Sequence, residues 1–433
     1  MKDSGIAWIG EIPSDWDIQK LKYSFDIFSG STPDSGNSDY WDGDIIWITP
    51  ADYNTEDKVI NDSDKKLTRT GYNACGTKIT PAKSLIFSKR APVGKVAVNS
   101  VPLCTNQGCF SCVPYEDIDV MYFYFMVSIC TEAFELVSSG STFKEISAEA
   151  FKSFKLPFPP FSEQHAIADY LDRRCGQIDE IVADLQRQIE CLKKYKKSLI
   201  SEVVTKGLNP HAPMKDSGIE WIGQIPEHWD CIKLRYLGSL QNGISKDAAS
   251  FGSGYPFVSY SDVYNHDILP SAPNGLIESS QNDRSVFSIE RGDVFFTRTS
   301  ETAEEIGFSS TCMKGIIDAV FAGFLIRFRP STTELLPEYS RFYFRAEMLR
   351  KYFVKEMMIV TRASLGQNLL KNLPVLLPPL QEQKQIADYL DRKCAEIDAI
   401  LDDKRRQVEV MKEQRKSVIY EYVTGKKRVK EAV

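Results

Sequence analysis

The chain has 433 residues, 42% of them hydrophobic and 26% charged, with a formal net charge of −6. This is an ordinary globular composition with room for roughly two to four domains, and its net acidity does not by itself indicate a nucleic-acid-binding protein. The longest apolar stretch, Val120–Cys130, is too short for a membrane span, and Lys2 and Asp3 interrupt any signal-peptide segment at the start. We therefore expect a cytoplasmic protein.

The opening segment of the chain occurs twice. MKDSGIAWIGEIPSDWDIQKLKY covers Met1–Tyr23, and the closely similar MKDSGIEWIGQIPEHWDCIKLRY covers Met214–Tyr236. A second phrase repeats in the same order, since PPFSEQHAIADYLDRRC begins at Pro159 and PPLQEQKQIADYLDRKC at Pro378. A repeat of this length is too long for a solenoid and indicates duplicated domains. We therefore predict a pseudo-twofold molecule, and such a molecule usually faces a twofold partner.

The opening motifs are predicted to be structural. Each contains an apolar cluster built around two tryptophans, and we expect it to pack near the base of the following domain and the end of a long helix, where a partner subunit could also bind. The tryptophans are Trp8, Trp16, Trp221 and Trp229.

Variable middle segments follow, at Ser24–Lys155 and Leu237–Asn372. Short β-branched and aromatic runs such as DIIWITPADY and GDVFFTRTS, cut by turns rich in Gly, Pro and Asn, predict mixed, strand-rich domains. The two middles share little sequence.

Each middle also holds a basic stretch. Lys58–Lys95 contains nine cations and two acids, and Arg327–Lys371 contains nine cations and four acids. Charge alone leaves two interpretations open, a solvated face or a patch that follows nucleic-acid phosphates.

The ten cysteines are scattered, as in a reducing compartment. Cys109 and Cys112 have CxxC spacing and Cys104 lies nearby, but a zinc site would need a second pair or histidines, and the chain has four histidines in all. Because the segment alternates like a strand, buried free thiols are favoured over zinc.

Long helices are predicted to close the two halves, at Phe161–Lys206 and Leu380–Lys427. Hydrophobic residues recur at every seventh position, which favours a coiled coil, and each helix would span about 65–70 Å. Two such helices in one chain should pair, antiparallel if a twofold axis crosses them. The repeating positions are Leu171, Ile178, Leu185, Leu192 and Leu199 in the first copy and Leu390, Ile397, Met411 and Val418 in the second, with Ile181, Tyr195 and Ile400 among the residues expected to widen the stripe.

The predicted fold class is α+β, with two mixed, strand-rich globular domains separated by two long α-helices that pair as an antiparallel coiled coil. The predicted boundaries are 1–155 for the first opening motif and domain, 156–213 for the first helix, 214–375 for the second motif and domain, and 376–433 for the second helix and the tail.

Catalytic motifs are largely missing from the sequence. It contains no NPPY- or DPPY-type methyltransferase motif, no GxxxxGK[ST] loop, no GxSxG and no zinc-protease helix. One nuclease-like pattern, Pro33-Asp34 followed by Glu56-Asp57-Lys58, could hold Mg²⁺ between two acids, but the second copy has no counterpart. We expect a non-catalytic chain without a bound metal; a stand-alone metal-dependent nuclease and a protein-binding coiled-coil adaptor remain as alternatives.

The repeated phrases KDSGIxWIGxIPxxW and PPxxEQxxIAxYLD, together with the duplicated layout, resemble the specificity subunit of type I restriction-modification systems over essentially the whole chain. FSKRAPVG at Phe87–Gly94, TNQG at Thr105–Gly108 and GST at Gly140–Thr142 resemble the first domain of that family. The second middle departs from it, with TRTSETAEEIG at Thr297–Gly307 in place of the SKRAPVG phrase.

The resemblance implies that each middle is a target-recognition domain for one half of a bipartite, asymmetric DNA site. It implies that the helices set the spacing and dock two modification subunits, which carry S-adenosylmethionine-dependent adenine methylation, and that ATP-dependent restriction subunits complete the complex. S-adenosylmethionine, ATP and Mg²⁺ would then be held by partners and no cofactor by this chain. The target sequence and its spacer length do not follow from the resemblance.

Contacts with double-stranded DNA are predicted in both middles. Phosphate contacts supply affinity and base edges supply sequence, with Arg or Lys suited to guanine and Asn or Gln to adenine. Arg90 and Arg298 are the strongest candidates because each follows an apolar, strand-like run. The predicted set is Lys65, Lys66, Arg69, Lys89, Arg90, Asn106, Gln107, Thr142, Arg298, Arg362, Gln367, Asn368 and Lys371, and the predicted scaffold and docking set is Trp8, Trp16, Trp221, Trp229, Leu171, Ile178, Leu390 and Ile397.

Overall fold

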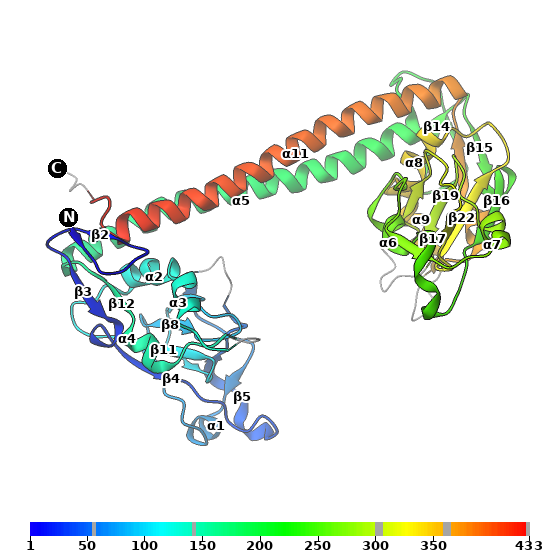
Figure 1. Ribbon diagram of the computed structural model, residues 1–433. Coiled ribbons are helices and arrows are strands. Elements are labelled where there is room, and N and C mark those ends of the chain that lie inside the picture. Colours follow the sequence, from blue (N-terminus) through cyan, green and yellow to red (C-terminus); the bar gives the residue numbers. More distant parts are fainter. Residues whose placement is uncertain (54–57, 141–143, 299–305, 358–364, 430–433) are drawn as a thin grey trace. The chain divides into compact units, whose positions relative to one another are not determined.

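The computed structural model describes residues 1–53, 58–140, 144–298, 306–357 and 365–429. It divides into two compact units, unit 1 (Met1–Gln186 with Arg406–Val433) and unit 2 (Arg187–Arg405). The two longest helices, α5 (Phe161–Lys206) and α11 (Leu380–Val423), are each shared between the units (Figure 1). Each unit therefore combines one strand-rich domain with a segment of both long helices. No helix in the described ranges is long and apolar enough to cross a membrane.

Unit 1 contains β1 (Lys2–Asp3), β2 (Glu11–Ile12), β3 (Asp17–Lys20), β4 (Phe25–Ser29), β5 (Trp41–Ile48), β6 (Val59–Ile60), β7 (Lys66–Leu67), β8 (Leu85–Ser88), β9 (Val96–Asn99), β10 (Cys104–Thr105), β11 (Cys109–Pro114) and β12 (Lys155–Phe158). Its helices besides α5 and α11 are η1 (Leu21–Tyr23), η2 (Ser38–Tyr40), α1 (Arg69–Asn73), α2 (Val120–Ser128), α3 (Thr131–Leu136) and α4 (Ala148–Ser153). The main sheet has the order β4-β11-β8-β9-β6, and a second sheet has the order β10-β5-β7. The opening motif forms the β1–β2 pair and the strand β3, which pairs with β12 just before α5.

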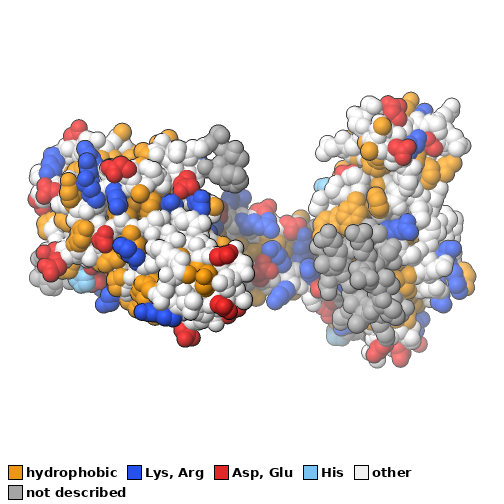
Figure 2. All heavy atoms as spheres, turned by 90° about the horizontal axis from the view of Figure 1, so that it is seen from below, with side chains coloured by type: hydrophobic (Ala, Val, Ile, Leu, Met, Phe, Trp, Pro, Cys, Tyr) orange, Lys and Arg blue, Asp and Glu red, His pale blue; other side chains and the backbone are white. Residues whose placement is uncertain are grey.

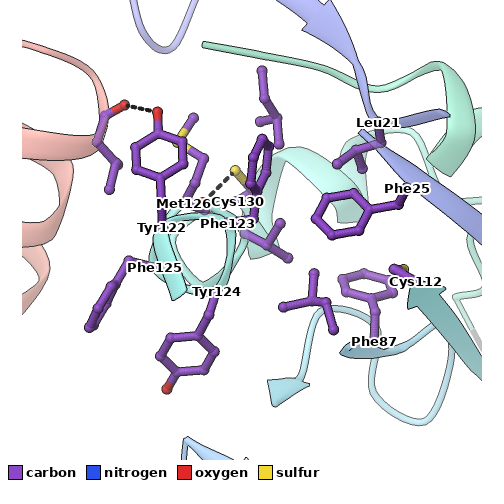
Figure 3. Packing of buried hydrophobic residues seen from close by; sticks show 14 of the residues in the cluster. Leu21, Phe25, Phe87, Cys112, Tyr122, Phe123, Tyr124, Phe125, Met126 and Cys130 are labelled. Carbon is purple, nitrogen blue, oxygen red and sulfur yellow. Dashed lines mark hydrogen bonds between the residues drawn. The ribbon is translucent and has the colours of Figure 1, made fainter. Parts of the chain in front are cut away.

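The core of unit 1 is organised around α2, whose sequence is apolar on every face, as expected of a helix buried all round. The Asp119 side chain caps it by accepting the backbone N–H groups of Met121 and Tyr122. Phe123 packs edge-on against Phe25 of β4, with ring centroids 5.1 Å apart (Figure 3). Each such buried aromatic side chain contributes about 1.5–3 kcal/mol to stability.

Unit 2 contains β13 (Met214–Asp216), β14 (Gln224–Pro226), β15 (Asp230–Lys233), β16 (Gly238–Asn242), β17 (Phe251–Val258), β18 (Gly275–Ile277), β19 (Val294–Thr297), β20 (Ser309–Thr311), β21 (Val320–Phe321), β22 (Leu325–Pro330) and β23 (Pro374–Leu377). Its own helices are η3 (Leu234–Tyr236), η4 (Ala248–Ser250), α6 (Tyr260–Asn265), α7 (Gln281–Val286), α8 (Pro337–Arg345), α9 (Met348–Met357) and α10 (Gln367–Lys371). The sheets have the orders β16-β22-β19-β20 and β18-β17-β21. Two middles of different sequence therefore share one strand order, with β16, β22, β19 and β20 in the places of β4, β11, β8 and β9.

The long helices pair antiparallel within each unit. In unit 1, Arg415 Nε of α11 lies 2.9 Å from Asp179 Oδ1 of α5. In unit 2, Lys196 Nζ of α5 lies 2.7 Å from Asp398 Oδ1 of α11. Residue numbers on α11 fall as those on α5 rise, which confirms the predicted antiparallel pair and the α+β fold class.

The seam between the helices follows the predicted repeat, since Leu171, Ile178, Leu390 and Ile397 are all buried. The prediction that further residues widen the hydrophobic stripe is wrong at three positions. Ile181, Tyr195 and Ile400 are 47%, 56% and 46% exposed. A coiled-coil seam advances by alternate steps of three and four residues, and these three lie beside that line. Cys175 and Cys394 occupy buried seam positions instead.

Each opening motif packs against the ends of both long helices. Trp16 is fully buried and its Nε1 donates to Glu163 Oε2 at the start of α5 (2.8 Å), while its ring lies against Gly425, just beyond the end of α11. We call this arrangement a joint. Trp229 forms the second joint: its Nε1 donates to Glu382 Oε2 at the start of α11 (3.1 Å), and its ring lies against Gly207, just beyond the end of α5. Both glycines have positive φ, 70° and 74°, the usual backbone for a residue that ends a helix.

Buried tyrosines link each strand-rich domain to a helix end contributed by the other copy. The Tyr122 hydroxyl of α2 donates to the Val423 carbonyl in the last turn of α11 (3.1 Å; Figure 3). The Tyr339 hydroxyl of α8 donates to the Val204 carbonyl in the last turn of α5 (3.3 Å). Each unit is thus completed by the helix that belongs to the other half of the sequence.

Replacing Leu171 or Leu390 with alanine should lower the free energy of unfolding of the unit that contains it by about 2–5 kcal/mol, because a fully buried leucine leaves a cavity. Urea unfolding measures the loss in the free energy of unfolding, and native-state hydrogen exchange shows which unit is destabilised. Ile181→Ala and Ile400→Ala are matched controls on the same helices and should cost less than about 1 kcal/mol. Equal losses at seam and control positions would contradict the seam.

Candidate nucleic-acid interface

Three segments of unit 1 meet where β8 ends. The Lys89 N–H donates to the Gly108 carbonyl (2.9 Å), and the Ile146 N–H donates to the Lys89 carbonyl (3.1 Å). The strand end is therefore held between the 105–108 turn and the segment that leads into α4. The predicted contact residues Lys89, Arg90, Asn106 and Gln107 belong to two of these segments, and the structure brings them into one region.

Glu145 engages both cations at this strand end. Its Oε1 lies 2.9 Å from Lys89 Nζ, and its Oε2 lies 3.3 Å from Arg90 Nη1. The hydrogen bond from Lys89, helped by Arg90, holds the pKa of Glu145 below its ordinary value. A DNA base or phosphate that took either cation would have to replace this carboxylate.

The two amides of the 105–108 turn differ in their roles. Asn106 shapes the turn, because its Oδ1 accepts the Gly108 N–H (2.8 Å) and its own N–H donates to the Ile48 carbonyl (2.8 Å). Gln107 is exposed, and its Oε1 accepts the hydroxyl of Thr32. Gln107 is thus the amide better placed for a base edge. The predicted Thr142 lies outside the described residues.

The predicted phosphate contacts lie on the second sheet of unit 1. Lys66 pairs with Asp62 (3.0 Å) and lowers the pKa of that carboxyl, while Arg69 begins α1 with its guanidinium 5.3 Å from the Tyr72 ring centre. Lys65 is exposed. Strand β10 of the same sheet ends immediately before Asn106. The three predicted phosphate contacts therefore belong to the same domain as the end of β8 and the 105–108 turn.

Arg298 occupies the corresponding place in unit 2. Its N–H donates to the Phe324 carbonyl (3.0 Å), and the Leu365 N–H donates to its carbonyl (2.7 Å). These contacts match those of Lys89, so Lys89 rather than Arg90 is the structural counterpart of Arg298. The residue before each, Ser88 or Thr297, also accepts a glycine N–H from the following loop. That shared hydroxyl residue was the available sequence signal.

The other predicted contacts of unit 2 lie on or near α10. Gln367 is half-buried and its Nε2 donates to Asn242 Oδ1 of β16 (3.0 Å), whereas Asn368 and Lys371 are exposed. The predicted Arg362 lies outside the described residues.

Five arginines of the basic stretch in unit 2 are structural. Arg329 binds Asp293 (2.6 Å), and Arg345 donates to backbone carbonyls that include Ser309 (2.7 Å). Arg350 donates to the carbonyl of Gly307 (2.7 Å), and burial lowers its pKa to about 10. Arg327 and Arg341 are almost fully buried. Neither interpretation of that stretch, a solvated face or a phosphate patch, holds for these five side chains.

Charge at the surface is mixed. Figure 2 shows Lys and Arg side chains interspersed with Asp and Glu on the visible face of both units. The net charge of the surface therefore does not identify the interface. The partners of each cation show whether its charge is available to a ligand.

The cysteines of the CxxC pair are free and buried. Cys109 and Cys112 are three residues apart on β11, so their side chains point to opposite faces of the sheet and cannot share one ion. Burial raises the pKa of Cys109 to about 12 and raises that of Cys112 as well. The described residues hold no cluster of metal-ligating side chains. These thiols are part of the core, as the alternation predicted.

The nuclease-like pattern gains no support. Glu56 and Asp57 lie outside the described residues, and Lys58 binds Asp172 of α5 rather than an active-site acid.

The predicted docking residues are mostly internal. Trp16 and Trp229 are fully buried, and the four selected helix residues lie in the seam. Trp8 and Trp221 are half-buried, with ring centres 6.5 Å from Tyr420 and 5.6 Å from Tyr352. Docking of a partner at these two tryptophans stays a prediction.

Residues 13–190 and 226–410 match the sequence model of the family described as Type I restriction modification DNA specificity domain. The chain is 25% identical over 444 residues to the Type I restriction enzyme MjaIX specificity subunit of Methanocaldococcus jannaschii, which covers 98% of this chain and 96% of that one. It is 25% identical over 340 residues to the EcoKI specificity subunit of Escherichia coli K12, over 75% of this chain and 70% of that one.

Two solved structures share the fold. A chain from a study of "complex assembly" and "conformational transition of the type I R-M system" matches with a TM-score of 0.74 and 16% identity, over 96% of this chain and 99% of that one. The HsdS subunit from Thermoanaerobacter tengcongensis matches with a TM-score of 0.54 and 16% identity, over 98% of this chain and all of that one.

Iodoacetamide at pH 8 should modify the exposed Cys191 and leave the buried Cys112 and Cys130 unmodified, because the thiolate is the reactive form and burial raises the pKa of both buried thiols. Peptide mass spectrometry reads the result, and a denatured sample, in which all three react, is the control. Faster labelling of Cys112 after addition of a chelator would instead indicate a bound metal.

Proposed function

The chain belongs to the family of type I restriction-modification specificity subunits, and we propose that its two target-recognition domains each read one half of a bipartite, asymmetric DNA sequence. As a specificity subunit it is a non-catalytic part of an enzyme complex.

One observation carries the proposal. The two domains share a strand order. They also share the same backbone contacts at the end of the corresponding strands β8 and β19, yet the side chains there differ. Unit 1 has Lys89 next to an exposed amide, Gln107, whereas unit 2 has Arg298, and its corresponding turn contains Gly323. Equal frames with unlike hydrogen-bonding groups are what an asymmetric target requires, because base edges are distinguished by their donors and acceptors.

Base contacts are proposed for Lys89, Arg90, Asn106 and Gln107 in unit 1, with Thr142 close to the DNA. In unit 2 they are proposed for Arg298, Arg362, Gln367 and Asn368, with Lys371 near the backbone. Lys65, Lys66 and Arg69 are proposed to contact phosphates. Support comes from their positions around the strand ends and on the neighbouring sheet.

The long helices are proposed to act as the spacer. An α-helix of 46 residues, the length of α5, is about 69 Å long, and α5 pairs with α11 in each unit. Two modification subunits would dock beside them and restriction subunits would join the complex, with S-adenosylmethionine, ATP and Mg²⁺ held by those partners. The site of action would be the cytoplasm, where the DNA is.

Co-expression of the chain with its modification subunit in a methylation-free host tests the function. Sequencing the methylome should reveal one bipartite adenine motif with two unlike halves. A methylome without a new motif would contradict the proposal.

Arg298→Ala should relax the recognised sequence in one half of the site and leave the other half unchanged, because Arg298 belongs to unit 2 alone. Losing a bidentate contact to guanine typically costs about 1–3 kcal/mol of discrimination. The methylome of the variant complex measures this at each motif position. Arg291→Ala, which removes an exposed arginine of the same unit, is the control and should leave the motif intact. An unchanged motif in Arg298→Ala would refute the assignment.

A further inference from the structure

The residues that recur in both copies are of two kinds. Some are buried and needed by the core, and others are exposed. Trp16 and Trp229 are identical and fully buried, so packing explains them. Tyr23 and Tyr236 also correspond, at the ends of η1 and η3, but they are 62% and 63% exposed. Packing does not require an aromatic side chain there in either copy.

A cation lies close to the ring of each tyrosine. In unit 1, Lys22 Nζ lies 5.3 Å from the Tyr23 ring centre. In unit 2, the Arg235 guanidinium lies 4.8 Å from the Tyr236 ring centre and its Nη2 donates to the tyrosine hydroxyl (3.0 Å). The replacement of lysine by arginine keeps the charge at the same position.

Neighbouring strands and helices add further positive charge. Lys20 of β3 lies directly opposite Lys155 of β12, an arrangement of like charges that destabilises a strand pair unless an anion offsets it. The short helices α4 and α10 pack against η1 and η3 and carry Lys152 and Lys371 at corresponding positions. We call these groups the basic corners; they are Lys20, Lys22, Tyr23, Lys152 and Lys155 in unit 1 and Lys233, Arg235, Tyr236 and Lys371 in unit 2.

None of these cations forms a salt bridge with an acid in the described part of the chain. Some other cations of the two units differ in this respect, since Lys58, Lys89 and Arg341 are all paired with carboxylates. The corners therefore keep positive charge available at the surface, next to a tyrosine hydroxyl.

DNA phosphates fit this repetition. Base contacts should differ between the copies because the two half-sites differ, whereas phosphates are the same along every sequence. A group of cations next to a hydroxyl, without a salt bridge to an acid among the described residues, suits an anion such as phosphate. Repeated exposed residues of the long helices, Asp169 and Arg173 with Asp388 and Arg392, carry both charge signs and lack this character.

We propose that the two basic corners bind DNA phosphates in a sequence-independent way and set the register of each recognition domain on the duplex. The proposal rests on the DNA-recognition function above. Residues that the two copies share would then supply affinity for DNA, and residues that differ between the copies would read the base sequence.

The test uses the chain assembled with its modification subunits. Fluorescence anisotropy would measure binding to the target duplex and to an unrelated duplex over a series of salt concentrations. K20Q/K22Q and K233Q/R235Q each remove two charges, so affinity for both duplexes should fall by the same factor, roughly 5- to 30-fold near 0.15 M salt. The slope of log affinity against log salt should decrease by about 2, and the methylated motif should not change.

The matched control is K194Q/K404Q, which removes two cations from α5 and α11 at positions where the other copy has no cation, namely Glu413 and Leu185. It should leave the salt slope unchanged. Thermal unfolding and the stoichiometry of the complex are measured for every variant.

Three outcomes would overturn the proposal. Slopes equal to that of the control would show that the corners do not contact phosphate. Loss of modification subunits at an unchanged slope would show a protein-docking surface, and weaker binding of the target duplex alone would show base reading. A parent complex that did not prefer its target would refute the recognition function itself, which distinguishes the two failures.

Discussion

The structure depends on a joint in which a buried tryptophan lies between the start of one long helix and the end of the other. Trp16 donates to Glu163 of α5 and packs on Gly425 beyond α11, and Trp229 does the same with Glu382 and Gly207. A buried indole N–H needs a partner, and a left-handed glycine lets the backbone pass close to the ring. The joint fixes each strand-rich domain to both helices, which leaves the side chains at the strand ends free to differ.

Two classes of cation differ sharply in their surroundings. One class is internal, as in unit 2, where buried arginines bind carboxylates and backbone carbonyls and so satisfy polar groups of the core. The other class is exposed and without an acidic partner among the described residues, as in the basic corners. An acidic protein can therefore bind a polyanion, because local charge next to the ligand matters more than the net value when salt screens beyond about 10 Å.

The repeat and the heptad spacing were enough to predict the duplicated architecture and the antiparallel helix pair, and the short β-branched and aromatic runs predicted the strand-rich middles. Side-chain exposure was harder to predict. Ile181 and Ile400 fit a broad hydrophobic stripe but lie beside the seam, and Arg345 could not be distinguished from a surface arginine because its partners are backbone carbonyls contributed by distant segments.

The structural equivalence of Lys89 and Arg298 was also hard to predict, because the loops that follow them differ and the hydroxyl residue before each is a weak signal beside the matching backbone contacts.

The exchange of helix ends between the two halves has a consequence for synthesis. Unit 2 is one continuous segment, Arg187–Arg405, whereas unit 1 combines the first 186 residues with the last 28. Ile419 and Val423 fill the core of unit 1, so this core stays open while unit 2 is being made. On the ribosome the domain that begins first is therefore completed last, and a truncation near the C-terminus removes part of the N-terminal core.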